Sequence, residues 1–200
     1  MSLSHPQFRS AILRATNLVQ IGSFLEGRPL AGIDHAECFR AALVLAVSSL
    51  DHYLHSLVVE SVMEMAQGVR LASAKFSEIK VSFASAQTNL ASGSIAWLGP
   101  ELREQNSHLT FQRPDKISAA LKIIDPRPHL WTRLAAHVDA NTKEQMCARL
   151  DLIVDRRNMI AHEADVDPTW GTVRPLTAAE VESVFAFLKT LVDSIESECW

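Results

Sequence analysis

Apolar residues recur at intervals of three and four along most of this 200-residue chain, which is the spacing of one face of an α-helix. The last segment shows the pattern most clearly, because its apolar stripe continues without a gap from Val181 to Ile195. Thr177 precedes this segment, and Glu180 follows three residues later, a pairing typical of an N-terminal capping box. The pattern predicts a long amphipathic helix at the end of the chain.

A similar signature predicts a helix over residues 142 to 163. Thr142 and Gln145 have the spacing of a capping box. The apolar residues that follow lie three and four positions apart, so they form one stripe: Met146, Leu150, Ile153, Val154 and Ile160.

The first third of the chain predicts two more helices. Helical spacing over residues 6 to 26 ends at Gly27 and Pro29. Asp34 and Glu37 then suggest a capping box that opens the longest helix, residues 35 to 66. Its first half is apolar nearly all round, which is typical of a helix at the centre of a bundle or against a partner chain.

The middle of the chain is less regular. Small and polar residues between 68 and 112, with a turn at Gly99 and Pro100, predict short helices and loops inserted in a bundle. Such an insertion could cover a site, contact a partner or do neither. Asp115 is expected to cap a short helix over residues 116 to 124, and a further short helix should follow Leu130. Residues 1–200 are therefore predicted to form one all-α domain.

Composition supports this fold class and narrows the function. Seven glycines and eight prolines leave few turns for an all-β fold, and 48% apolar residues suffice for a large core. A formal charge of -4 argues against a bulk electrostatic nucleic-acid binder. Any contact with RNA must then be local, and Arg149, Arg156 and Arg157 are the best candidates. For Arg149 and Arg156 the alternative is a solvated helix face.

The cysteines, the N-terminal residues and the most apolar run predict a cytoplasmic protein. Cys38, Cys147 and Cys199 show no C-x-x-C spacing, so reduced thiols are expected. The N-terminal residues lack the pattern of a signal peptide. The most apolar run, residues 38 to 50, is broken by Arg40 and is too short to span a bilayer, so no membrane association is expected.

Three residues near the end of the 142–163 helix form the candidate site. Arg157 falls on the apolar stripe, where a guanidinium needs either a carboxylate or a polar cleft. Asn158 and His162 share a neighbouring face of the helix. A permanent cation, an amide and an imidazole can together handle a phosphate. The alternative is structural: a buried ion pair at Arg157, a local hydrogen bond at Asn158 and a helix cap at His162.

A carboxylate on the longest helix is a candidate supporting residue. Asp51 and His55 are one turn apart and share a face. Asp51 could orient Arg157 or His162, or it could form an exposed pair with His55. His52 and His55 have a spacing that metal ligands can use, but no third ligand supports a metal site, and none is expected.

Three blocks of sequence resemble a known family. The segment R-N-M-I-A-H at Arg157–His162 resembles the signature of the HEPN superfamily, the higher eukaryote and prokaryote nucleotide-binding domain. Its surroundings, L-D-L-I-V-D-R-R-N-M-I-A-H-E-A-D, together with L-T-F-Q-R-P-D-K-I and F-R-A-A-L-V-L-A-V-S-S-L-D-H-Y-L-H upstream, resemble the RiboL-PSP-HEPN family. The blocks occur in the right order and span about residues 35 to 195.

The resemblance implies a HEPN-like helical bundle with ribonuclease activity in a toxin or phage-defence system. It implies a homodimer in which two motif helices build one composite site, with a carboxylate comparable to Asp51 in the second helix. Some relatives have lost the motif and only bind, so a non-catalytic nucleotide- or RNA-binding sensor that docks a separate effector is the alternative. An antitoxin or defence partner protein is also expected.

The chemistry of RNA fits these residues. RNA carries its own nucleophile, the 2'-hydroxyl, so cleavage needs proton transfer and a fixed cation rather than a metal or cofactor. His162 is the candidate for proton transfer, Arg157 for binding the phosphate, and Asn158 for positioning. The expected substrate is RNA such as tRNA, and the expected products are a 2',3'-cyclic phosphate and a 5'-hydroxyl.

Overall fold

The computed structural model describes residues 1–28, 32–90, 93–137 and 142–200. Within them the chain forms eight α-helices and one short 3-10 helix, and the only β-pairing is an isolated bridge between Val166 and Val173. The all-α prediction is confirmed. The elements are α1 (Ser4–Glu26), α2 (Ala36–Ala66), η1 (Ala74–Glu78), α3 (Phe83–Leu90), α4 (Leu98–Asn106), α5 (Pro114–Leu121), α6 (Leu130–Ala136), α7 (Lys143–Glu163) and α8 (Ala178–Cys199).

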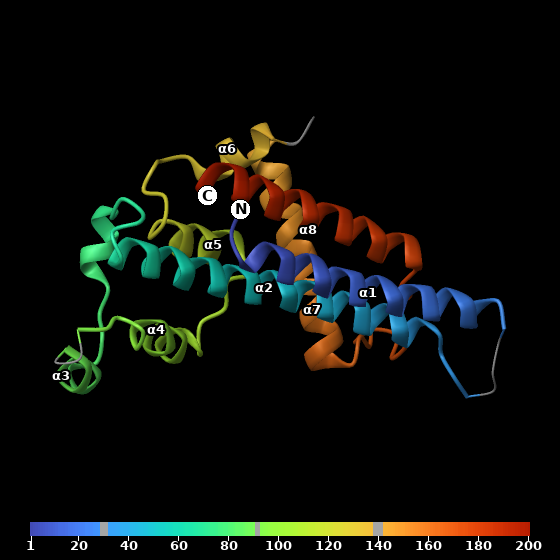
Figure 1. Cartoon of the computed structure of the whole chain (residues 1–200). Helices are drawn as coiled ribbons and strands as arrows, with labels where there is room; N and C mark the ends of the chain where they lie inside the picture. Colours follow the sequence, from blue (N-terminus) through green and yellow to red (C-terminus); the bar gives the residue numbers. More distant parts are fainter. Residues whose placement is uncertain (29–31, 91–92, 138–141) are drawn as a thin grey trace.

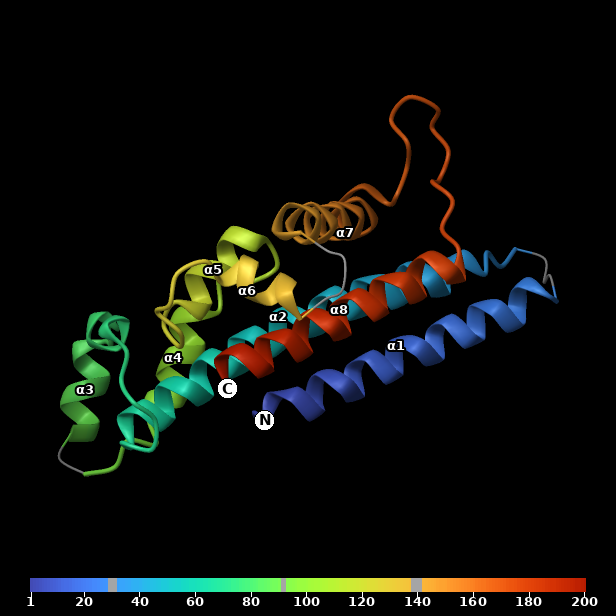
Figure 2. The same ribbon diagram turned by 90° about the horizontal axis from the view of Figure 1, so that it is seen from above.

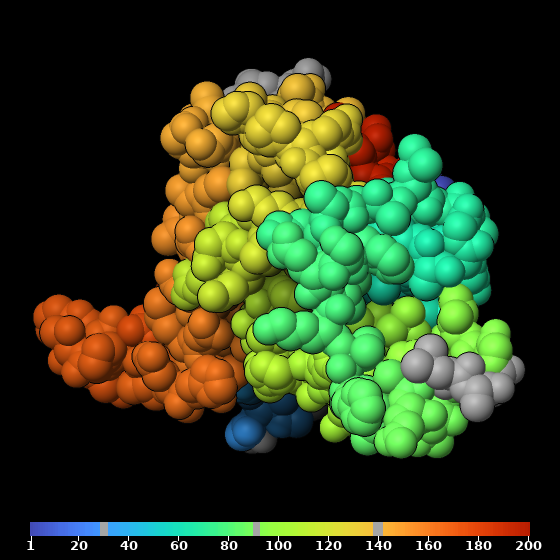
Figure 3. Space-filling view, turned by 90° about the vertical axis from the view of Figure 1, so that its left-hand side faces the viewer, coloured from blue at the N-terminus to red at the C-terminus, as the bar shows by residue number. Residues whose placement is uncertain are grey.

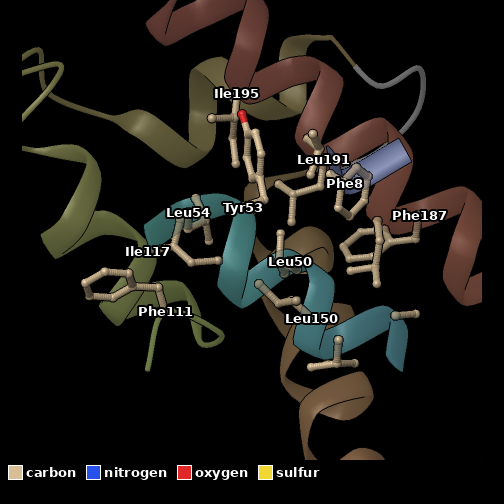
Figure 4. Packing of buried hydrophobic residues seen from close by; sticks show 14 of the residues in the cluster. Phe8, Leu50, Tyr53, Leu54, Phe111, Ile117, Leu150, Phe187, Leu191 and Ile195 are labelled. Carbon is tan, nitrogen blue, oxygen red and sulfur yellow. The ribbon is translucent and has the colours of Figure 1, made fainter. Parts of the chain in front are cut away.

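Helix α2 is the centre of the bundle. Helices α1 and α8 run beside it, whereas α7 crosses it steeply and is seen nearly end-on in Figure 2. Side chains from α1, α5, α7 and α8 converge on α2, including those of Phe8, Ile117, Leu150 and Leu191 (Figure 4). This arrangement accounts for the apolar character of α2, because its buried residues occur all round the helix.

The hydropathy of α2 has the same origin. By length and composition this 31-residue helix could cross a bilayer, since its most apolar window has a mean hydropathy of 1.4. However, 61% of that window is buried inside the protein. The apolar residues of α2 therefore pack against neighbouring helices.

Helices α7 and α8 begin where their capping boxes predict. The Thr142 hydroxyl accepts a hydrogen bond from the Gln145 backbone N–H at 3.3 Å, and the Gln145 side chain accepts one from the Thr142 N–H at 3.0 Å. Thr177 and Glu180 form the same reciprocal pair at the start of α8. Both capping boxes are confirmed, and they set the starts of α7 and α8.

Two other predicted caps are wrong. The Asp34 carboxylate accepts from the Ala36 N–H at 2.9 Å, but the residue at the N-cap of α2 is His35. No reciprocal bond forms, because the Arg40 guanidinium attracts both Asp34 and Glu37. Asp115 lies inside the first turn of α5.

Helix α5 starts earlier than predicted because of a proline. Pro114 takes the first helical position, where its fixed φ favours a helix and its missing N–H costs nothing. Arg113 is therefore the N-cap residue.

The stretch from 68 to 112 contains η1, α3 and α4 joined by loops, as predicted. It lies at one end of α2, with α4 packed against that helix (Figure 1). Residues 91 and 92 lie outside the described part of the chain. The segment that leaves α4 carries Phe111 and Gln112 back to the middle of the bundle, beside α7.

Candidate active site

Arg157 lies on the side of α7 that faces the bundle. It continues the stripe formed by the buried residues Leu150, Ile153 and Val154. The Arg157 guanidinium donates a hydrogen bond through Nη2 to the side-chain oxygen of Gln112, which is itself buried. Its Nε is buried and has no hydrogen-bond partner among the described residues. Arg157 is therefore a half-buried cation whose hydrogen bonding is incomplete.

No carboxylate lies within ion-pair distance of Arg157 in the described parts of the chain. Burial lowers the pKa of Arg157 from its usual value, and the negative charge of Asp51 only partly opposes this effect. The guanidinium stays protonated, because its pKa is very high to begin with. A desolvated cation of this kind gains strongly from an anion that enters the site.

Asp51 acts on Arg157 at longer range. Its carboxylate accepts a hydrogen bond from the Phe111 N–H at 2.5 Å and lies 3.9 Å from the His55 ring nitrogen. Holding Phe111 also holds the next residue, Gln112, against Arg157. The structure thus brings Asp51 into the surroundings of Arg157 without direct contact, and its supporting role stays a prediction.

Asn158 and His162 have less crowded surroundings than Arg157. Asn158 is half-buried, His162 is exposed, and neither side chain hydrogen-bonds to a described residue. The αL residue Ala164 ends the helix, with its N–H bonded to the Met159 carbonyl, so His162 does not cap it. Neither structural alternative proposed for these two residues is found.

The directions of Arg157 and His162 differ. Five residues along an α-helix correspond to a rotation of roughly 140°, so the two side chains leave α7 on different sides. His162 lies in the last turn, where α7 passes beyond the rest of the bundle. One protomer therefore does not bring the imidazole against the guanidinium.

The two other predicted RNA-binding arginines are held by their own chain. Arg149 donates to Ser183 Oγ at 2.8 Å and lies over the Phe187 ring, so it joins α7 to α8. Arg156 donates to the Asp165 carboxylate at 2.9 Å and to the Pro175 carbonyl. Both arginines contribute to packing between segments of the chain.

Asp165 is a key residue that the sequence analysis missed. It is fully buried, and its Oδ2 accepts hydrogen bonds from Arg40 at 3.0 Å and from Arg156. It anchors the 164–176 segment, which projects from the body of the protein after α7 (Figure 3, orange). The sequence signal that could have indicated it is a carboxylate two residues after the end of α7.

Gln112 was also missed. It belongs to the block L-T-F-Q-R-P, which carried part of the family resemblance, so its position was indicated but its role was not. The next residue, Arg113, pairs with Asp151 and Asp155 on α7 and so ties this segment to the motif helix.

The two histidines of α2 lie apart from Arg157. The His55 ring stacks on Phe111 with centroids 4.3 Å apart, and His52 is exposed. Among the described residues, no group of three His, Cys, Asp or Glu side chains converges on a point where a metal could bind.

The profile of the RiboL-PSP-HEPN family matches residues 12–200, nearly the whole chain. The chain belongs to this family. Its three resembling blocks lie on α2, on the segment that holds Gln112, and on α7, and these are the elements that meet around Arg157. Membership supports a HEPN-type nuclease or RNA-related module. Comparisons with curated proteins and with solved structures gave no match.

Proposed function

We propose that this RiboL-PSP-HEPN protein is a metal-independent endoribonuclease of a cytoplasmic toxin or phage-defence system. The observation that carries the proposal is Arg157, a partly desolvated cation with a buried unpartnered Nε and no carboxylate bound to it. It sits in the family motif beside Asn158 and His162, which are free of hydrogen bonds to described residues. A phosphate would supply the missing acceptor.

The reaction follows from RNA chemistry. A base removes the proton from the ribose 2'-oxygen, which attacks the adjacent phosphorus and forms a new O–P bond. The bond from phosphorus to the 5'-oxygen breaks, and an acid protonates that oxygen. His162 transfers protons, Arg157 binds the non-bridging oxygens as their charge grows, and Asn158 holds the phosphate or the imidazole. A 2',3'-cyclic phosphate and a 5'-hydroxyl result.

A homodimer would complete the site. Arg157 and His162 leave α7 in different directions, and two proton transfers are easier with two imidazoles. Leu152, on the outward side of α7, is 70% exposed, and a side chain of this kind gains free energy when a second copy covers it. Two α7 helices related by a two-fold axis would place both His162 residues in one cleft.

The test of the mechanism uses the 200-residue chain with tRNA or total RNA in EDTA. We expect cleavage to cyclic phosphate ends in the wild type and at least about 10²-fold slower cleavage with His162→Ala or Arg157→Ala. Cleavage that needs added metal, or that persists in both variants, would contradict the proposal.

The test of the dimer uses sedimentation. Leu152→Glu should convert a dimer into monomers and abolish cleavage without lowering the melting temperature, because Leu152 is exposed in the single chain. Full cleavage by a protein that is monomeric at the assay concentration would rule out the composite site.

The alternative is a sensor that binds RNA or a nucleotide and docks an effector or antitoxin. Arg157 and His162 leave α7 on different sides, which favours a sensor, since binding needs only the arginine. In calorimetry with RNA, a pure binder would lose affinity in Arg157→Ala and tolerate His162→Ala.

A further inference from the structure

Two hollows lie next to each other on α2. The first, of about 560 Å³, lies between α1 and α2, and its lining includes Arg14. The second, of about 320 Å³, lies between α2 and the end of α4, and its lining includes Arg103. Ser48 and His52 line both hollows. The two hollows therefore adjoin on α2, with Ser48 and His52 between them, and we call the pair the α2 groove.

One part of the groove approaches the candidate active site. Asp51 lines the second hollow, and it is the carboxylate whose charge acts on Arg157. Asp51 also binds the N–H of Phe111, the neighbour of the residue that accepts from Arg157. A chain lying in the groove would thus pass close to the phosphate-binding position proposed for Arg157.

The charges of the groove are unusual for this acidic protein. Arg14 and Arg103 are exposed, and neither forms an ion pair with a described residue. By contrast, Arg9 on the same helix as Arg14 binds both carboxylate oxygens of Asp193, at 2.9 and 2.8 Å. The carboxylate that lines the groove, Asp51, is already engaged by the Phe111 N–H. The two arginines face one carboxylate, so the fixed charges that line the groove sum to a positive value.

The floor of the groove is suited to bases. In the first hollow, Leu45 provides partly exposed apolar surface, and the buried Phe8 and Ala11 lie beneath it. In the second, the His55 ring is stacked on Phe111 and borders the cavity. Hollows of this size, within the range of about 300–1,000 Å³ found for small-molecule pockets, suit individual nucleotides and not a duplex. Arginines at the ends and apolar or aromatic surface between them match the backbone and bases of a single strand.

We propose that the α2 groove binds the single-stranded RNA that flanks the scissile phosphate, with Arg14 and Arg103 contacting neighbouring phosphates. This inference rests on the proposed ribonuclease function and extends it. It also replaces the RNA-binding role predicted for Arg149 and Arg156, whose side chains are occupied within the chain. RNA would thus cross α2 before it reaches α7.

The experiment measures binding separately from cleavage. A fluorescein-labelled single-stranded oligoribonucleotide is titrated with His162→Ala protein, and fluorescence anisotropy is recorded at several salt concentrations. Arg14→Gln and Arg103→Gln are added singly to this background. Arg9→Gln is the matched control, because it removes the same charge from α1 outside the groove. A circular dichroism melt confirms that each variant is folded.

We expect each groove variant to raise the Kd about three- to tenfold and to lower the slope of log K against log salt by about 0.7, the value for one lost phosphate contact on a single strand. Arg103→Lys should keep the slope, because it keeps the charge. Groove variants that behave like Arg9→Gln would overturn the inference. Loss of dimerisation in these variants, with RNA affinity unchanged, would assign the groove to a second copy and also overturn it.

The two proposals can fail separately. If the wild type binds the oligoribonucleotide through Arg14 and Arg103 but never cleaves it, the groove stands and the ribonuclease function falls. If the wild type cleaves RNA and both groove variants keep its KM, the ribonuclease function stands and the groove falls.

Discussion

Two neighbouring arginines on α7 have opposite surroundings. Arg156 shares the buried carboxylate of Asp165 with Arg40, which also binds Asp34, Glu37 and a backbone carbonyl. Arg157, one residue later, has the side-chain oxygen of Gln112 and a buried Nε without a partner. The first arginine is held by a carboxylate of its own chain, although Asp165 Oδ1 also lacks a hydrogen-bond partner among the described residues, whereas Arg157 has no carboxylate.

The pKa values follow the same division. Burial alone would lower the pKa of Arg40, but its hydrogen bond to Asp165 and the charges of Glu37, Asp165 and Asp34 outweigh this and raise it. Burial also lowers the pKa of Arg157, and the distant Asp51 does not compensate. A cation that a fold desolvates without pairing lowers stability, which is typical of a position kept for a ligand.

The largest expected effect is on RNA cleavage, at the site that contains Arg157 and His162. His162→Ala should lower the rate of RNA cleavage by about 10²–10⁴-fold, the usual contribution of a general acid or base. Its free energy of unfolding should change by less than about 0.5 kcal/mol, because an exposed side chain without hydrogen bonds is removed. Single-turnover cleavage and urea unfolding measure the two quantities. A large loss of stability would mean that His162 is structural.

A substitution at Asp165 should have the opposite result, with a large effect on stability. Asp165→Asn should lower the free energy of unfolding by about 3–5 kcal/mol, because Arg40 and Arg156 would lose the carboxylate that compensates their burial. Urea unfolding monitored by circular dichroism gives this value. Asp167→Asn in the same projecting segment is the control, since Asp167 is less buried. A loss below about 1 kcal/mol would show that water, not Asp165, satisfies these arginines.

Replacing Arg157 should lower activity without lowering stability. Arg157→Met should lower cleavage by about 10²–10³-fold, as expected when a group that stabilises transition-state charge is lost. The same change should leave the free energy of unfolding within about 1 kcal/mol of the wild type, because removing a half-buried cation that lacks a carboxylate offsets the loss of the hydrogen bond to Gln112. Thermal melts compare it with Arg156→Met, which should destabilise the protein.

The smallest expected effect comes from giving Arg157 a carboxylate partner. Gln112→Glu would give Arg157 a carboxylate partner, like the one Arg156 already has. We expect about 1 kcal/mol of added stability, the difference between a charged and a neutral hydrogen bond, and roughly tenfold slower cleavage as the paired arginine attracts phosphate less. Gln112→Ala should slow cleavage without adding stability. Faster cleavage in Gln112→Glu would argue against Arg157 as the phosphate-binding group.

Local sequence was a good guide wherever the determining contacts are local. The caps at Thr142 and Thr177 and the ends of α2 were predictable, because capping and helical periodicity involve residues within four positions of one another. The failures at Asp34 and Asp115 came from neighbours that changed the local outcome, namely Arg40 and Pro114.

The sequence by itself therefore determined an all-α chain, the helix that carries Arg157, Asn158 and His162, and the family to which they belong. Only the tertiary structure decided which arginine is paired with a carboxylate and which is left without one. Asp165 reaches Arg40 across 125 residues and Gln112 reaches Arg157 across 45, so both contacts depend on how the helices pack. Charge pairing over such separations is not encoded in any single segment, because burial and proximity arise only when α2, α7 and the segment between them come together.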